Sequence, residues 1–221
     1  MGTWMGLLIA AVAALAPAAA CSEELVLTLA PEKTSATFWV SATFWVSATV
    51  LDIDGVLAMG PGQIRFDSAT GAASGQITID LRGTKTGSRL RDWEMHRRVL
   101  ETERYPLAVF RLDRMLGTLA PSGTSDLVLA GIVTMHGAEH AMMVPVRATV
   151  SGGTVSAEAV FEIPYVAWGL RDPSLLFLRV TPVAVVNVKV RGDLRADPEV
   201  AKAQAIKRRA DPMISLRGPR Q

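Results

Sequence analysis

The feature that most constrains this chain is residues 35–50, where apolar and polar side chains alternate without a break. The hexapeptide Ser-Ala-Thr-Phe-Trp-Val occurs twice in succession there, at Ser35–Val40 and Ser41–Val46. A period of two, built from β-branched and aromatic residues, predicts a β-strand. Because the repeat has an even length, the second copy keeps every side chain on its original face. We therefore expect one lengthened strand, with one face formed by Ala36, Phe38, Val40, Ala42, Phe44, Val46, Ala48 and Val50.

Short alternating segments bounded by turn residues recur along the rest of the chain. The expected strands are Leu25–Ala30, Gln63–Asp67, Gln76–Leu81, Leu107–Leu112, Asp126–Met135, Ala141–Val150, Thr154–Ile163, Leu175–Val180 and Val183–Arg191. This spacing, without a strand–helix–strand rhythm, is typical of an all-β antiparallel barrel or sandwich. In a barrel of about eight strands, inward Phe and Val side chains either fill the core or line a ligand cavity. The pattern alone leaves both open.

One helix is predicted within the strands, at about 92–101, with Asp92 as its N-cap. Its apolar stripe comprises Trp93, Met95, His96, Val99 and Leu100. Tyr105 precedes Pro106 and ends the helical segment, because a residue before proline disfavours the α conformation. A single helix among strands is typical of a plug or lid on a barrel, so we expect the functional site beside it.

The first 20 residues predict a secretory signal peptide, although no Lys or Arg precedes the apolar run. Leu7–Leu15 is apolar, Pro17 breaks the run, and Ala18–Ala20 resembles the small-residue cleavage site of a signal peptide. The run is too short to span a membrane. Cys21, the only cysteine, follows directly. Two interpretations of Cys21 stay open: lipidation, as in a bacterial lipoprotein, or a cysteine that merely lies near the cut. A single cysteine cannot form an intramolecular disulfide.

Positive charge is concentrated at the C-terminus. The net charge of the chain is +2, and residues 196–221 carry six basic and three acidic residues. The rest of the chain is therefore close to neutral, which argues against nucleic acid as the main partner. We interpret residues 196–221 as a flexible basic tail. Weak attraction of this tail to anionic lipid is the alternative.

Residues that could carry chemistry are sparse. His136, Glu139 and His140 fall in one predicted turn, but a closed metal site needs four ligands, so we expect a solvated turn and no metal. His96 is the best candidate base, yet no nucleophile motif accompanies it. Arg91, just before the predicted helix, either pairs within a loop or holds a polar head group at a cavity mouth. Catalysis is not expected from these residues.

Several motifs, taken in order, resemble the YceI-like family. They are Gly62–Asp67, Ser74–Ile77, Arg91–Asp92, Met95–His96, Val99–Glu101, Tyr105–Phe110, Leu129–Gly131, Met135–Gly137 and Ile163–Ser174. Their order over roughly residues 25–194 makes the match specific. The resemblance implies an antiparallel, lipocalin-like β-barrel of about eight strands. It also implies export to the bacterial periplasm and an elongated cavity that holds a polyisoprenoid or a similar amphiphile.

The residues and this resemblance together predict an exported, non-catalytic protein that binds a polyisoprenoid or quinone-like lipid and uses no cofactor. Its parts would be a signal peptide (1–20), a lipid-binding barrel (21–195) and the basic tail (196–221). Arg91, His96 and Trp168 are placed near the mouth or lid of the cavity. The predicted cavity lining is Phe38, Phe44, Val46, Ile64, Ile77, Ile79, Met95, Val99 and Phe110.

Two other functions remain open. A filled barrel could serve as an envelope-stress or partner-docking module without lipid, and a dry core with an exposed apolar patch would favour that hypothesis. An enzyme would need a second acid or base beside His96. Attachment to a membrane surface through Cys21 or the basic tail, and formation of a homodimer, are also left open by the sequence.

Overall fold

The computed structural model describes residues 24–44, 49–67 and 70–197. The predicted signal peptide, Cys21, Val46 and nearly all of the basic tail lie outside these ranges, so the predictions made for them stay predictions. Within these ranges, no helix is both long enough and apolar enough to cross a bilayer.

The described residues form one antiparallel sheet and three short helical segments. The strands are β1 (Glu24–Leu29), β2 (Ser35–Phe44), β3 (Thr49–Met59), β4 (Gln63–Asp67), β5 (Ala73–Lys85), β6 (Leu107–Leu116), β7 (Gly123–Met135), β8 (Ala138–Ser151), β9 (Thr154–Ile163), β10 (Leu178–Val180) and β11 (Ala184–Ala196). The helical segments are the 3-10 turn η1 (Pro31–Lys33), the α-helix α1 (Arg89–Glu94) and the π-helical segment η2 (Met95–Val99).

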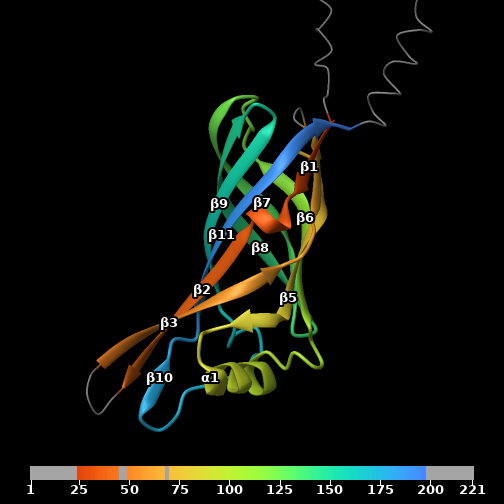
Figure 1. Ribbon diagram of the computed structural model, residues 1–221. Coiled ribbons are helices and arrows are strands. Elements are labelled where there is room, and N and C mark those ends of the chain that lie inside the picture. Colours follow the sequence, from red (N-terminus) through yellow and green to blue (C-terminus); the bar gives the residue numbers. More distant parts are fainter. Residues whose placement is uncertain (1–23, 45–48, 68–69, 198–221) are drawn as a thin grey trace, which may run out of the picture.

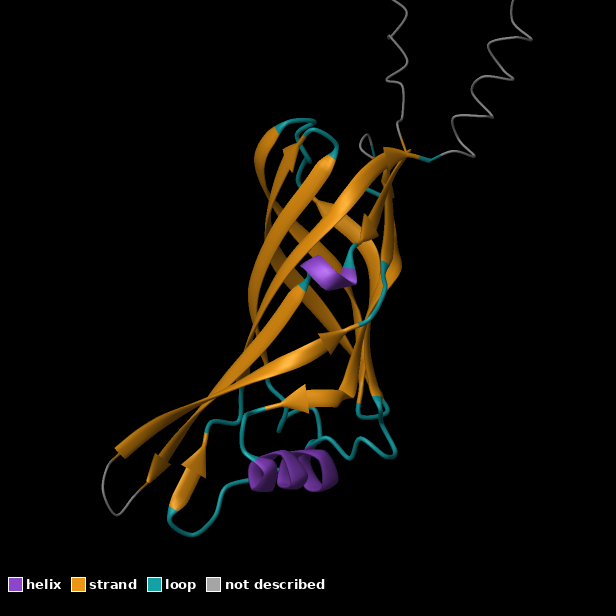
Figure 2. Ribbon diagram, viewed as in Figure 1, coloured by secondary structure: helices purple, strands orange, loops and turns teal. Residues whose placement is uncertain are grey.

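The sheet closes on itself as an eight-stranded barrel (Figures 1 and 2). The ring runs β2–β3–β5–β6–β7–β8–β9–β11 and returns to β2 through the pairing of β11 with β2. Beyond that pairing, residues 192–196 of β11 pair with β1, and residues 73–76 of β5 pair with β4. β1 and β4 therefore occupy the places of β2 and β3 at the end of the barrel that holds the chain termini. The predicted lipocalin-like, antiparallel barrel is confirmed.

The duplicated hexapeptide does not form one long strand, and the expectation of an unbroken strand over 35–50 was wrong. β2 ends at Phe44 and β3 begins at Thr49, and these two residues pair across a hairpin. Figure 1 shows this hairpin extending beyond the barrel, with β10 beside it. The reversal of the chain resets the alternation, so Val50 is 62% exposed and the residues of β3 that face the barrel interior are Leu51, Ile53, Leu57 and Met59.

The helix also differs from the prediction. α1 begins at Arg89, three residues before the expected start, and Ser88 occupies the N-cap position without a capping side-chain bond. Asp92 is not the cap, because its carboxylate accepts hydrogen bonds from Thr86 instead. Trp93 was expected in the apolar stripe but is 48% exposed. The helical segment lies across the end of the barrel opposite the chain termini (Figures 1 and 2).

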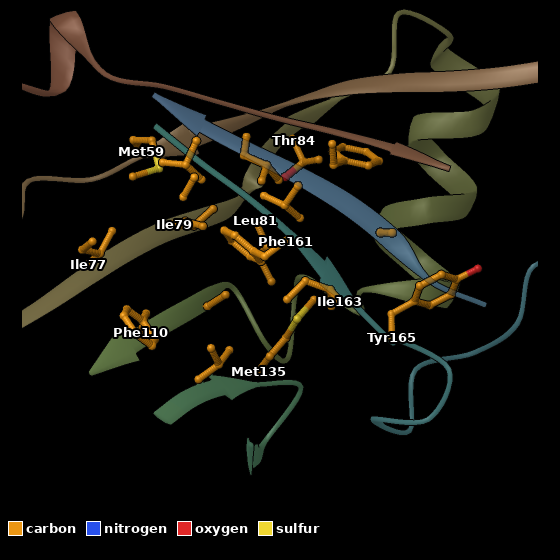
Figure 3. Close-up of a pocket in the computed structure, with 18 of the residues that line it drawn as sticks. Met59, Ile77, Ile79, Leu81, Thr84, Phe110, Met135, Phe161, Ile163 and Tyr165 are labelled. Atoms are coloured by element: carbon orange, nitrogen blue, oxygen red, sulfur yellow. The ribbon is translucent and has the colours of Figure 1, made fainter. Parts of the chain in front are cut away.

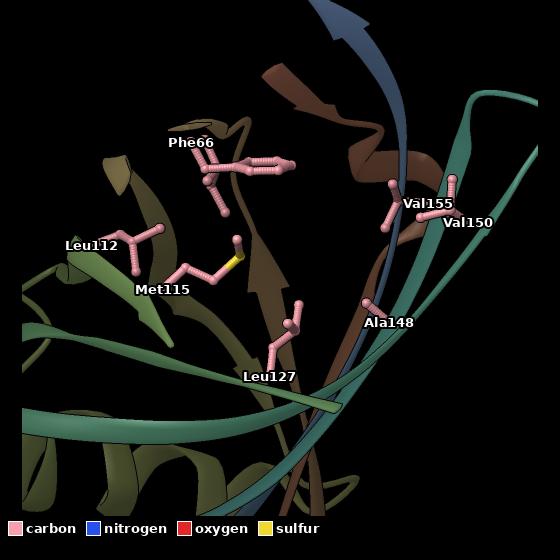
Figure 4. Packing of buried hydrophobic residues seen from close by; sticks show 8 residues of the cluster. Phe66, Leu112, Met115, Leu127, Ala148, Val150 and Val155 are labelled. Carbon is pink, nitrogen blue, oxygen red and sulfur yellow. The ribbon is translucent and has the colours of Figure 1, made fainter. Parts of the chain in front are cut away.

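A compact hydrophobic cluster closes the other end of the barrel (Figure 4). Its buried members come from five strands: β4, β6, β7, β8 and β9. Its buried members are Ile64, Phe66, Leu112, Met115, Leu127, Ala148, Val150 and Val155. Six of these eight residues, all but Leu112 and Val150, also line the cavity described below, so the cluster forms the apolar floor of that cavity.

Candidate functional site

An apolar cavity of about 740 Å³ occupies the barrel between the hydrophobic cluster and the helical segment. This volume is within the range of roughly 300–1,000 Å³ that is usual for small-molecule sites. Each of the eight wall strands contributes apolar side chains, because alternation turns every second residue inward. Figure 3 shows part of this wall, formed by residues of β5, β6, β7 and β9: Ile77, Ile79, Leu81, Phe110, Met135, Phe161 and Ile163.

Two phenylalanines of the wall lie against glycines of neighbouring strands. A Cβ atom at Gly55 would come within 2.1 Å of the Phe38 ring, and one at Gly131 within 2.2 Å of the Arg111 carbonyl oxygen and 3.0 Å of the Phe110 ring. Glycine is therefore required at both places, because any side chain would displace the ring. The two aromatic rings of the wall therefore lie directly against the backbone of the neighbouring strands.

The cavity opens to solvent at the helical end. Met95 and Val99 of η2, and Leu100 directly after it, line the cavity at this end, where the helical segment forms a lid across the barrel. Leu90 and Leu175 also line the cavity, although their side chains are 78% and 61% exposed. Both residues lie at the helical end of the barrel, on either side of the cavity. The mouth therefore lies between α1 and the segment that precedes β10.

Most of the residues predicted for the site lie in the cavity wall. They are Phe38, Ile64, Ile77, Ile79, Arg91, Met95, Val99 and Phe110. Phe44 is the last residue of β2, in the hairpin that extends beyond the barrel. Val46 falls outside the described residues. Their role in binding a ligand stays a prediction, because the structure gives their position only.

His96 and Trp168 lie at the lid end but are not among the described residues that line the cavity. His96 Nε2 is 2.9 Å from the carbonyl oxygen of Thr84 and therefore donates to it, while Nδ1 faces the Thr102 hydroxyl at 3.4 Å. This bond ties the lid to the end of β5. Trp168 stacks on His140, with ring centroids 4.1 Å apart. Both residues thus hold the lid end together from outside the cavity.

The His136–His140 turn is solvated at Gly137, Ala138 and Glu139, as expected, but its two histidine rings pack against aromatic side chains. His136 and Gly137 form a tight two-residue turn with φ angles of 52° and 77°, which is the hairpin geometry of a primed turn. The His136 ring packs on Tyr105, and its Nε2 atom is buried. The described residues contain no cluster of three or more His, Cys, Asp or Glu side chains that could hold a metal ion.

The charged groups before the helix bond to one another. Arg91 donates from Nε to the Thr86 hydroxyl and from Nη2 to the Thr86 carbonyl. The Thr86 hydroxyl in turn donates to Asp92 Oδ1 at 2.6 Å. These hydrogen bonds from Thr86 hold the pKa of Asp92 below its usual value. Two roles were considered for Arg91, and the one seen in the structure is pairing within the lid, through its hydrogen bonds to Thr86.

Replacing Asp92 by Ala should loosen the lid. The substitution leaves the Thr86 amide and hydroxyl without their acceptor, at a cost of about 1–2 kcal/mol in the free energy of unfolding. Hydrogen exchange of the helical amides should accelerate in the variant. Because the pKa of Asp92 is lowered, its contribution is present above the ordinary carboxyl pKa and is lost as the pH falls through the folded value. Asp113→Ala, which removes a half-exposed carboxylate from β6, is the control and should leave these amides unchanged.

Tyr165 should make the free energy of unfolding fall as the pH rises above 10. Its side chain is buried at the cavity wall, its hydroxyl donates to the Thr181 carbonyl at 2.7 Å, and burial raises its pKa to about 12. A raised pKa means that the stabilisation is complete below pH 10 and is lost as the pH rises towards 12. The loss is about 1.4 kcal/mol at pH 11. Urea titrations at pH 8 and 11 should show this loss in wild type and not in Tyr165→Phe. An equal loss in both proteins would contradict the assignment.

The sequence did not single out the cavity residues of β7, β8, β9 and β11. The structure adds Val133, Val144, Ala159, Phe161 and Val186 to the wall, among others. The alternation within those strands could have identified these residues, since every second residue of a strand points to the same face. The strands were predicted, but which face of each looks inward follows from the barrel closure.

Comparisons with known proteins support the same fold. The YceI-like domain family matches residues 27–196. The chain is similar to the crystal structure of BcnA from Burkholderia cenocepacia, with 18% identity, a TM-score of 0.58, and coverage of 74% of this chain and 98% of that chain. It is also similar to a polyisoprenoid binding domain from Saccharophagus degradans, with 14% identity, a TM-score of 0.58, and coverage of 77% and 98%. No curated protein sequence matches it. At these identities the two structures support the fold, and the family match covers most of the chain: this protein belongs to the YceI-like family.

Proposed function

We propose that this protein binds a polyisoprenoid or a quinone-like amphiphile in its barrel and carries it without catalysing a reaction. The observation that carries the proposal is the apolar cavity of about 740 Å³, closed by a hydrophobic cluster at one end and open beside the lid at the other. A long apolar chain with one polar end matches a cavity that has one closed and one open end.

The energetics of burial favour such a ligand. Each CH₂ group taken out of water contributes about 0.8 kcal/mol. The cost of ordering a flexible chain reduces the net affinity well below the sum of these contributions. A branched isoprenoid is less flexible than a straight acyl chain of the same length, so it loses less entropy on binding. The polyisoprenoid binding domain from Saccharophagus degradans, which shares the fold, supports this ligand class.

The side chains of the lid support a binding role rather than catalysis. His96, the best candidate base, donates from Nε2 to the Thr84 carbonyl on β5. Arg91 is bonded to Thr86 within the lid. Neither group is held ready to move a proton on a substrate. A binding protein of this kind needs no cofactor or metal.

We further propose that the protein is exported. The support is the leader sequence of residues 1–20, with its apolar run and small-residue cleavage site. In an envelope compartment, a barrel with this cavity would carry a lipid that is insoluble in water between membranes or enzymes.

A filled barrel that docks a partner is the second candidate, and one observation favours it. The segment before β10 exposes Leu176 and Phe177, at 94% and 56%, on the surface beside the mouth. Exposed apolar patches mark interaction sites. The same patch is also suited to contact the membrane from which a lipid is taken, so lipid uptake decides between the two functions.

Uptake from vesicles tests the proposal. The mature protein is incubated with phosphatidylcholine vesicles that contain a prenyl quinone, separated from them, and extracted with solvent. We expect close to one quinone per chain in the protein fraction. Phosphatidylcholine itself should stay with the vesicles. A protein fraction without quinone would favour the docking function.

A further inference from the structure

The polar residues of the cavity wall are concentrated at its lid end. Thr84, Thr86, Ser88, Arg91 and Glu94 follow one another from the end of β5 into α1 and all line the cavity. The opposite end is formed by the apolar cluster around Phe66 and Met115 (Figure 4). A bound amphiphile would therefore lie with its polar end towards the lid and its apolar chain towards the cluster.

A β-bulge directs Thr84 into the cavity. Along β5 the inward residues are Ile77, Ile79 and Leu81, and unbroken alternation would continue to Gly83. The register with β3 shifts instead: Ala58 pairs with Asp80 and Val56 with Lys85. The extra residues reverse the parity, so that Thr84 and not its neighbours lines the cavity (Figure 3). Bulges commonly re-aim a side chain next to a functional site.

The Thr84 hydroxyl is buried without a hydrogen-bond partner in the described structure. The residue is 1% exposed, and its Oγ1 atom has no acceptor or donor within reach. Thr86, two residues later, provides the contrast, because its hydroxyl both donates to Asp92 and accepts from Arg91. Buried hydroxyl groups in folded proteins are nearly always paired. His96 bonds the carbonyl oxygen of Thr84 and so ties down the backbone that carries the hydroxyl.

We propose that the Thr84 hydroxyl hydrogen-bonds the polar head of the bound lipid, and that this head is a neutral oxygen group, either an alcohol or a quinone carbonyl. The inference rests on the proposed lipid-binding function and extends it to the class of head group. A diphosphate would fit poorly, since Arg91, the only cation of the described cavity wall, is already bonded to Thr86 and Glu94 adds a negative charge. A charged group buried without a counter-charge is strongly disfavoured.

The test uses two probes that differ in one hydroxyl group. Phytol is a branched isoprenoid alcohol, and phytene is the same hydrocarbon without the hydroxyl. Each displaces a fluorescent lipid from the cavity of the full mature protein. Thr84→Val keeps the shape of the side chain and removes the hydroxyl, so we expect about tenfold weaker binding of phytol, the loss of one buried hydrogen bond. Binding of phytene should not change. Thr84→Ser should restore the affinity for phytol.

The matched control is Thr78→Val, on the same strand but not among the described residues that line the cavity. It should bind both probes as wild type does. If Thr84→Val binds phytol as tightly as wild type, the hydroxyl has only water as its partner and the inference is overturned. If wild type binds neither probe, the lipid-binding function itself fails. The two failures are therefore distinguishable.

Discussion

Ala159→Trp should abolish lipid binding and leave the barrel folded. Ala159 lies midway along β9, is 9% exposed and lines the cavity. Its pairing partner on β11 is Val188, so no large side chain lies directly across the strand pair. An indole at this position would occupy the space of the lipid chain. We expect at least about a 100-fold loss of affinity, because a rigid wall cannot move aside for both groups. Displacement titration with phytol measures the loss.

The stability of the same variant separates the two candidate functions. In a hollow barrel the indole enters empty space, so the unfolding midpoint in urea should change little. In a filled barrel it would overpack the core at a cost of about 1–3 kcal/mol. Val160→Trp, at the neighbouring position that is 46% exposed, is the control and should bind lipid normally. Normal lipid binding by Ala159→Trp would contradict the location of the site.

Leu112→Ala should give the largest loss of stability. Leu112 is 3% exposed in the cluster that closes the barrel, and it does not contribute to the described cavity wall. Truncating a buried leucine removes its burial energy and leaves a void, which together cost about 2–5 kcal/mol. Urea denaturation measures the change.

Leu107→Ala is the matched control on the same strand, because Leu107 is 43% exposed. It should cost less than about 0.5–1 kcal/mol, as is usual for surface positions. The affinity of folded Leu112→Ala for phytol should stay near that of wild type, since the floor and not the wall is changed. A destabilisation equal to that of the control would mean that the cluster does not hold the barrel closed.

The barrel could be predicted from the sequence because alternation is a local property. Thr154–Ile163, for example, shows the alternation within ten residues, and it was predicted as a strand with the bounds that β9 has in the structure. The same local pattern hid the hairpin formed by β2 and β3. In the sequence, the second copy of the hexapeptide continues the alternation past Phe44, so nothing in the spacing marks the end of β2 there.

The cavity wall was predictable in part, and its polar contact was not. Ile77 and Ile79 were placed in the cavity by parity alone, and the structure has both in the wall. Thr84 was missed because its inward direction depends on the bulge between β5 and β3, which is set by pairing and not by local sequence. His96 was placed at the lid because it falls on the single predicted helix, but its bond to the Thr84 carbonyl follows only from the packed structure.

The central claim is that the protein carries a lipid, and native mass spectrometry tests it most directly. The full chain, expressed with its leader and purified without detergent from a bacterial periplasm, is weighed intact and then extracted with organic solvent. Ala159→Trp, prepared in the same way, is the control. We predict a discrete added mass on wild type that extracts as a prenyl alcohol or a quinone, and no added mass on the variant. A wild-type protein of bare polypeptide mass that takes up no quinone or prenol when these are supplied would contradict the account.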